Sequence, residues 1–178
     1  MLVTIVLATV TVVGVIGLKV LFKKQDKEAE QKRQEDRVNR VTAAVMSALC
    51  NPNSITYQGQ YTSLEAAFIK SFIARQLRGE REPRAQEYVE KALKWRAENL
   101  HGAIARRTTH QTLLKRVRRK MSGQFTTLEI TQFITEEEMV DREVENARND
   151  FFRLREDADQ LGFRTWSNYQ DYLLLKLQ

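Results

Sequence analysis

Four consecutive residues, Glu98-Asn99-Leu100-His101, come nearest in this sequence to a metal-ligand motif. A glutamate and a histidine three residues apart lie on one face of a helix, and carboxylate-bridged di-iron bundles use this spacing. Such a centre needs two copies of the motif and two further glutamates, whereas this sequence holds a single copy. A histidine near a helix C-terminus also interacts favourably with the helix dipole, without any metal. We therefore expect no metal ion and no cofactor.

The other reactive side chains also favour structural roles. His110 shares a helical face with Leu114, which predicts a histidine at the edge of a core. Cys50 is the only cysteine, so the chain has no internal disulfide, and its place at the end of an apolar stripe predicts a small buried side chain. Glycine-rich phosphate loops, nucleophile elbows and His-Glu-x-x-His motifs are absent from the sequence. We expect a protein that is not an enzyme and has no small-molecule substrate.

A basic segment is the strongest binding signal in the sequence. Residues 103–124 contain seven basic side chains and no acidic one. Such a surface suits nucleic acid or anionic lipid, and the intervening Thr108, Thr109 and Thr112 would add hydroxyl donors for phosphates or bases. The candidate anion-binding residues are Arg106, Arg107, Lys115, Arg116, Arg118, Arg119 and Lys120.

The segment that follows carries the opposite charge. Residues 125–161 contain eleven acidic and four basic side chains. Helices that are neighbours in sequence commonly pack antiparallel, which would lay the basic segment against the acidic one. Internal pairing is therefore the favoured interpretation of the basic charge, and nucleic-acid binding is the alternative.

The N-terminal 22 residues predict a transmembrane anchor. Between Leu2 and Phe22 the only charge is Lys19, and a helix of this length spans about 32 Å, close to the ~30 Å hydrocarbon core of a bilayer. A cleaved signal peptide would have a basic start, a shorter apolar run and a small-x-small cleavage site; a cut after Gly17 fits this pattern poorly. Because Lys19, Lys23, Lys24 and Lys27 all flank one end, we expect the body on the cytoplasmic side, or on the matrix or stromal side in an organelle.

Beyond the anchor, apolar spacing predicts an all-α chain with a stalk and a bundle. Only seven glycines and two prolines occur in 178 residues, too few for many tight turns. We expect an anchor over 1–22, a charged helical stalk over 23–37, and a small antiparallel helical bundle over 38–178. The first expected helix covers 23–50, with an apolar stripe that begins at Val38, and the second covers 62–79, with Phe68, Ile69, Phe72, Ile73 and Leu77 on one face. The third covers 83–100 and ends at a stop at His101-Gly102, after which a separate helix runs to Met121. A further helix runs from a capping box at Thr135 to Gly162, and Ser167 caps the last helix.

The most regular apolar pattern predicts a helix-pairing seam. Its members alternate by four and three residues, as in paired helices. They are Val140, Val144, Ala147, Phe151, Leu154, Ala158 and Leu161. A seam occupied within the chain predicts a monomeric bundle, and an unoccupied seam predicts a homo-oligomer or a partner helix.

Two functions remain from the sequence. The first is a single-pass membrane protein whose helical head assembles proteins at the membrane, as a scaffold or accessory subunit. The alternative is a membrane tether for nucleic acid that uses the basic helix over 103–121. The layout of anchor, charged stalk and helical head is similar to that of phage membrane proteins that tether replicating DNA, and of single-pass accessory subunits of large membrane assemblies.

Overall fold

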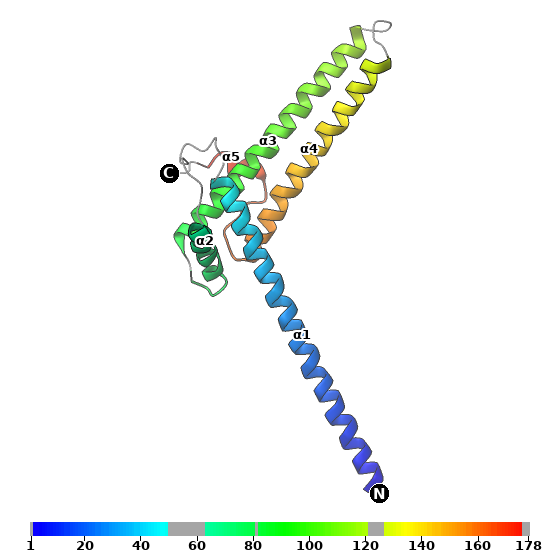
Figure 1. Ribbon diagram of the computed structural model, residues 1–178, viewed down its shortest axis with the longest axis vertical. Helices are drawn as coiled ribbons and strands as arrows, with labels where there is room; N and C mark the ends of the chain where they lie inside the picture. Colours follow the sequence, from blue (N-terminus) through cyan, green and yellow to red (C-terminus); the bar gives the residue numbers. More distant parts are fainter. Residues whose placement is uncertain (1, 50–62, 81, 121–126, 176–178) are drawn as a thin grey trace. The chain divides into compact units, whose positions relative to one another are not determined.

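The computed structural model describes residues 2–49, 63–80, 82–120 and 127–175. It describes no side chains for residues 2–22, 63–65, 117–120, 127–130 and 133, although these lie in helices. Every element in these ranges is a helix, which confirms the all-α prediction. The elements are α1 (Leu2–Leu49), α2 (Ser63–Gln76), α3 (Pro83–Lys120), α4 (Thr127–Gln160) and α5 (Tyr169–Leu173), labelled in Figure 1.

The chain divides into two compact units, Met1–Arg37 and Val38–Gln178. In the first unit, the side chains from 23 to 36 are exposed except for the half-buried Gln34. Glu30 lies within ion-pair distance of Arg33 (3.8 Å) and Arg37 (3.4 Å). Exposed pairs of this kind contribute about 0–1 kcal/mol each, so water solvates most of this charge.

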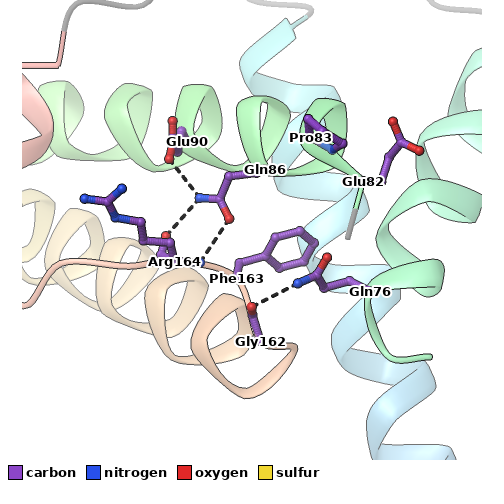
Figure 2. A pocket seen from close by; sticks show the side chains of 8 residues that line it. All are labelled: Gln76, Glu82, Pro83, Gln86, Glu90, Gly162, Phe163 and Arg164. Atoms are coloured by element: carbon purple, nitrogen blue, oxygen red, sulfur yellow. Dashed lines mark hydrogen bonds between the residues drawn. The ribbon is translucent and has the colours of Figure 1, made fainter. Parts of the chain in front are cut away.

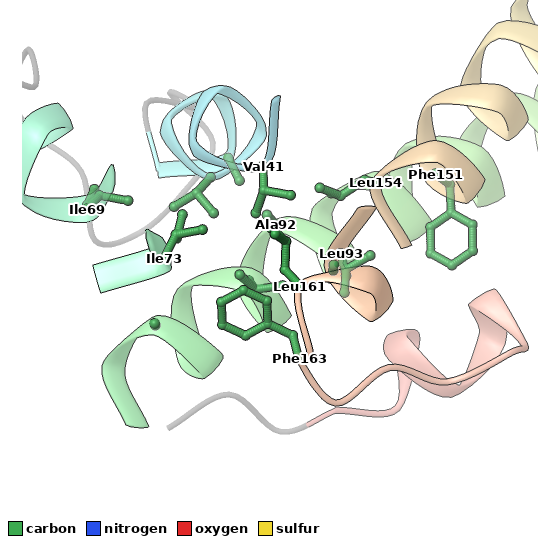
Figure 3. Close-up of a cluster of buried hydrophobic side chains, with 14 of the residues drawn as sticks. Val41, Ile69, Ile73, Ala92, Leu93, Phe151, Leu154, Leu161 and Phe163 are labelled. Atoms are coloured by element: carbon green, nitrogen blue, oxygen red, sulfur yellow. The ribbon is translucent and has the colours of Figure 1, made fainter. Parts of the chain in front are cut away.

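The second unit has one hydrophobic core, shown in part in Figure 3. Side chains from four helices meet there, among them Val41 of α1, Ile73 of α2, Ala92 of α3 and Leu154 of α4. Val38, Val41 and Val45 are all buried, which confirms the predicted apolar stripe at this end of α1. The end of α1 therefore belongs to the core of the second unit.

The apolar face predicted for α2 is partly wrong. Ile69, Phe72 and Ile73 are buried, but Phe68 is 53% exposed and Leu77 is 39% exposed. The Phe68 ring instead contacts the edge of the Phe72 ring, with centroids 4.2 Å apart. A helix of this length offers a narrow stripe to the core, so apolar residues at its margins remain in solvent.

The predicted helix stop at His101-Gly102 is wrong, because α3 runs through it without a break. Positive φ angles occur at Gly79 and Gly162, not at Gly102, so Gly102 has ordinary helical geometry. A mid-helix glycine costs about 1 kcal/mol. Leu100 and Ala103, on either side, are both buried, and burying one leucine is worth about 1.5–3 kcal/mol. The packing of these two residues therefore outweighs the tendency of Gly102 to end the helix.

The start predicted for α4 at Thr135 is also wrong, since the helix begins at Thr127. The Thr135 hydroxyl does not cap a helix; it donates to the carbonyl of Thr131 one turn earlier, at 3.0 Å. The predicted end is confirmed. Gly162 has a φ of 83°, and the amide of Phe163 donates to the carbonyl of Ala158 at 3.0 Å, as in a glycine-terminated helix.

The last helix begins one residue later than predicted. Asn168, not Ser167, is the N-cap, and its side chain accepts from the Gln170 amide at 3.1 Å. Tyr172 of α5 is fully buried. Its hydroxyl accepts from the Trp166 amide at 2.7 Å and donates to the Trp166 carbonyl at 3.3 Å, and burial raises the pKa of the phenol. These contacts dock the described C-terminal segment on the core.

Replacing Gly102 with alanine tests whether α3 is continuous. An alanine Cβ there would meet only the Arg106 side chain, at 3.5 Å, so G102A should stabilise the fold by about 0.5–1 kcal/mol. The matched control is G162A, which should destabilise by about 1–2 kcal/mol because its backbone is left-handed. Urea unfolding followed by circular dichroism measures both. A destabilising G102A would contradict a continuous helix.

Candidate functional site

We call the second compact unit, Val38–Gln178, the head. A cavity of about 500 Å³ lies in the head and is lined mainly by polar side chains. Figure 2 shows its lining residues, from the end of α2, the start of α3 and the segment after α4. Gln86 accepts from the Arg164 amide (3.0 Å) and donates to the Arg164 carbonyl (3.1 Å). Gln76 donates to the Gly162 carbonyl at 3.0 Å. The two amides therefore hold the segment after α4 in place, and this explains the cavity wall without a ligand.

Sequence reasoning missed Gln76 and Gln86. Both are glutamines in helical segments, a residue type that is common on solvated faces. Their partners are backbone groups 86 and 78 residues away in the chain. No local pattern reveals a contact of that separation, so only the fold identifies them.

A smaller cavity of about 120 Å³ lies beside an ion pair between α1 and α4. Arg40 donates from Nε to Asp157 Oδ2 (2.7 Å) and from Nη2 to Asp157 Oδ1 (2.6 Å). Asp157 is 6% exposed, whereas the Arg40 side chain is 39% exposed. A buried carboxylate held by a two-pronged guanidinium is the most desolvated ion pair among the described side chains.

Removing Arg40 should destabilise the head, because Asp157 would remain buried without its partner. Loss of one member of a buried pair costs about 3–5 kcal/mol; we expect about 2–3 kcal/mol for R40A, since water reaches one side of this pair. The double variant R40A/D157A should lose less than the sum of the single losses. The control R142A breaks an exposed pair with Glu138 and should change stability by under about 0.5 kcal/mol. Equal small effects for R40A and R142A would contradict the account.

α3 and α4 pair antiparallel and continue together away from the core, as Figure 1 shows. We call the part over 101–120 and 127–147 the arm. Arg96 pairs with Asp150 (2.8 Å), Arg107 with Asp141 (2.8 Å), and Arg106 with Glu143. The partner numbers fall as the α3 numbers rise, which fixes the antiparallel register.

The arm is thinly packed. Among its described side chains, only Ala103, Leu114 and Val144 are buried. His110 is half-buried. Its Nε2 is buried and has no hydrogen-bond partner within the described part of the chain. The arm therefore depends on few apolar contacts.

The predicted seam residues of α4 face the interior of this helix pair. Phe151, Leu154, Ala158 and Leu161 belong to the core of the head, and Val144 is buried in the arm. Val140 and Ala147 are half-buried. The seam is thus occupied within the chain, largely by α3, so the seam itself is not free to pair with a second copy or a partner helix, and any such contact must use another surface.

The candidate basic residues fall into two groups. Arg106 donates from Nε to Glu143 at 3.2 Å, and this hydrogen bond raises the pKa of its guanidinium; Arg107 pairs with Asp141. Lys115 and Arg116 are exposed and form no ion pair with the described side chains. The side chains of Arg118, Arg119 and Lys120 lie outside the described residues.

The threonines between these groups are not the hydrogen-bond donors that the sequence suggested. Thr108, Thr109 and Thr112 donate to the carbonyls of Ile104, Ala105 and Thr108, at 2.9, 3.0 and 2.8 Å. A hydroxyl has one proton, so each can offer only lone pairs to a ligand. Base recognition through these hydroxyl donors is therefore excluded in this conformation.

The remaining sequence candidates are Glu98, His101 and Cys50. Glu98 and His101 are exposed on α3, and Cys50 lies outside the described residues. Among the side chains that the structure describes, no three His, Cys, Asp or Glu residues are grouped closely enough to hold a metal ion.

In the part of the chain with described side chains, no helix combines the length and the apolar character needed to cross a membrane. The predicted anchor over 1–22 lies outside those side chains. The chain matches no protein-family model, no curated protein and no solved structure.

Proposed function

We propose that the protein is a single-pass, membrane-anchored accessory protein without enzymatic activity, whose helical body assembles proteins at the membrane. Segment 2–22 is the anchor in this proposal, and the body lies on the cytoplasmic, matrix or stromal side. The observation that carries the assembly role is a pair of exposed apolar side chains on the arm, Leu113 and Met139.

Leu113 and Met139 lie on the same side of the arm. Arg106 precedes the half-buried Arg107, and Glu143 precedes the seam residue Val144. Because Arg106 and Glu143 contact each other, residues one position before the inward-facing ones share one side of the helix pair. Leu113 precedes the buried Leu114, and Met139 precedes the seam residue Val140. Leu113 is 51% exposed and Met139 is 63% exposed. A thinly packed helix pair with apolar side chains on one outer side suits a further helix from a partner.

The anchor is tested by placing charge inside segment 2–22. In V10D/V13D, each aspartate should oppose insertion by about 2.5–3.5 kcal/mol, and each lost valine removes a further few tenths. We expect the full chain to resist alkaline extraction from membranes and the variant to be released. Q25D/Q31D, with the same charge change in the stalk, is the control and should behave like the unmodified chain. Release of the unmodified chain would contradict the anchor.

Assembly through the arm is tested on the full chain, extracted in mild detergent from the membranes in which it is naturally made. Light scattering should give a protein mass above that of one chain. L113D/M139D should reduce this association at least about tenfold, since a charge replaces buried apolar contact at the interface.

The matched control for this test carries two aspartates outside the arm, at the exposed Leu77 and Leu174. L77D/L174D should leave the mass unchanged, and circular dichroism should show equal helix content in both variants. A mass of one chain for the unmodified protein contradicts the assembly role. Equal loss in both variants contradicts the assignment of that role to the arm.

A further inference from the structure

A second pair of residue stripes runs along one outer side of the arm. The stripe on α3 consists of residues three or four apart, namely Arg106, Thr109, Leu113 and Arg116. The stripe on α4 has the same spacing and consists of Glu136, Met139 and Glu143. This spacing places the members of each stripe on one helical face. Because Arg106 contacts Glu143, both stripes lie on the same side of the arm. We call these seven residues the outer face.

The outer face has an apolar centre and charged neighbours. All seven side chains are exposed. The centre is formed by Leu113 and Met139, which together are the apolar members of the two stripes. Arg116 follows Leu113 by one turn of α3, and Glu136 precedes Met139 by one turn of α4. Among the described side chains, neither Arg116 nor Glu136 has an ion-pair partner.

This order of residues makes the outer face complementary to itself. In an antiparallel helix pair, residue numbers on one helix fall as those on the other rise. A contact between Leu113 and Met139 of a second copy therefore fixes the residues beside it. Arg116, three residues further along α3, meets Glu136 of the second copy, three residues back along α4. A two-fold dimer forms this set of contacts twice, because each copy supplies both stripes.

From this complementarity, and on the premise of the proposed function that the arm is the assembly surface, we infer that its partner is a second copy of this chain. The two arms pack through their outer faces into an antiparallel four-helix bundle, with each α3 against α4 of the other copy. Leu113 packs on Met139, and Arg116 pairs with Glu136, between copies. Thr109 fits this interface because its hydroxyl already donates to the carbonyl of Ala105, so its burial leaves no donor unpaired.

The charges favour this arrangement over its alternatives. If α3 packed on α3 of the second copy, Arg106 and Arg116 of the two chains would face each other. An anionic membrane or a nucleic acid would approach the carboxylates of Glu136 and Glu143. In each of these cases, like charges meet beside an apolar contact that excludes water, where repulsion is strong. Packing of α3 against α4 of a second copy brings opposite charges together instead.

The test is charge reversal in the full chain, produced on its own and purified in neutral detergent. Light scattering should give the protein mass of two chains. R116E and E136R should each weaken the dimer about tenfold, since each places like charges together at two symmetric positions.

Mixing the two variants tests whether the pairing is between chains. A dimer of one R116E chain and one E136R chain has the reversed charge pair at one position and the natural pair at the other. This mixture should therefore dimerise within about threefold of the unmodified affinity, although each variant alone is weakened.

The matched control is K115E. Lys115 is the exposed neighbour of Arg116 but does not belong to the stripe of α3, and the change of charge is the same. K115E should leave the dimer affinity within about threefold of the unmodified value. Circular dichroism should show equal helix content in all variants.

Two results would overturn the inference while the proposed function stands. The first is a mass of one chain for the protein produced alone, when the chain from its natural membranes has a larger mass, because the partner is then a different protein. The second is a dimer that L113D/M139D disrupts but that R116E, E136R and K115E affect equally, because charge then does not determine the pairing. A mass of one chain from both sources contradicts the proposed function as well.

Discussion

The contact between Arg40 and Asp157 is the constraint on which the arrangement of the head depends. It joins the end of α1 to the last turns of α4, across 117 residues of sequence. Asp157 is 6% exposed, and a buried carboxylate without a partner would be strongly unfavourable. The placement of the end of α1 that brings Arg40 to this carboxylate satisfies the charge and also buries Val41 and Val45. A buried pair of this kind adds little net stability over an apolar replacement, but it strongly disfavours any packing that separates the partners.

From that contact outward, packing weakens along the helix pair. Around Phe151 and Leu93 the core is complete, with both side chains fully buried. In the arm, polar side chains are half-buried: Arg107 forms an ion pair with Asp141, and Nε2 of His110 has no hydrogen-bond partner in the described chain. Next to Leu114, Lys115 and Arg116 are exposed and form no ion pair with the described side chains. The same two helices thus change from a tightly packed core to a helix pair whose described side chains are mostly exposed.

Sequence patterns predicted the parts of this fold that local chemistry determines. Val38, Val41 and Val45 were placed in the core by their spacing, and Gly162 marked the end of α4 because only glycine adopts its backbone readily. The predictions at Gly102 and Thr135 were both wrong. Each rested on a local preference of about 1 kcal/mol, and burial of residues on either side of Gly102 exceeds that energy.

The functional surfaces were only partly accessible to sequence reasoning. The excess of basic charge from 103 to 124 is plain in the sequence, but its division is not. Whether Arg106 or Arg116 is neutralised depends on the register of α3 against α4, and a shift of one turn would exchange their roles. Gln86 and Asp157 were missed because their partners lie far away in the chain. Such contacts follow from the fold, not from the segment in which a residue occurs.

Hydrogen exchange on the full chain in detergent tests most directly whether the end of α1 is part of the core locked by Arg40 and Asp157. Amides over 38–49 should exchange as slowly as those over 151–161, because both segments open only when the head unfolds. Amides over 103–116 should exchange faster, since the arm buries few side chains. Rapid exchange over 38–49, at the rate of the exposed segment 23–37, would contradict this account and separate α1 from the head.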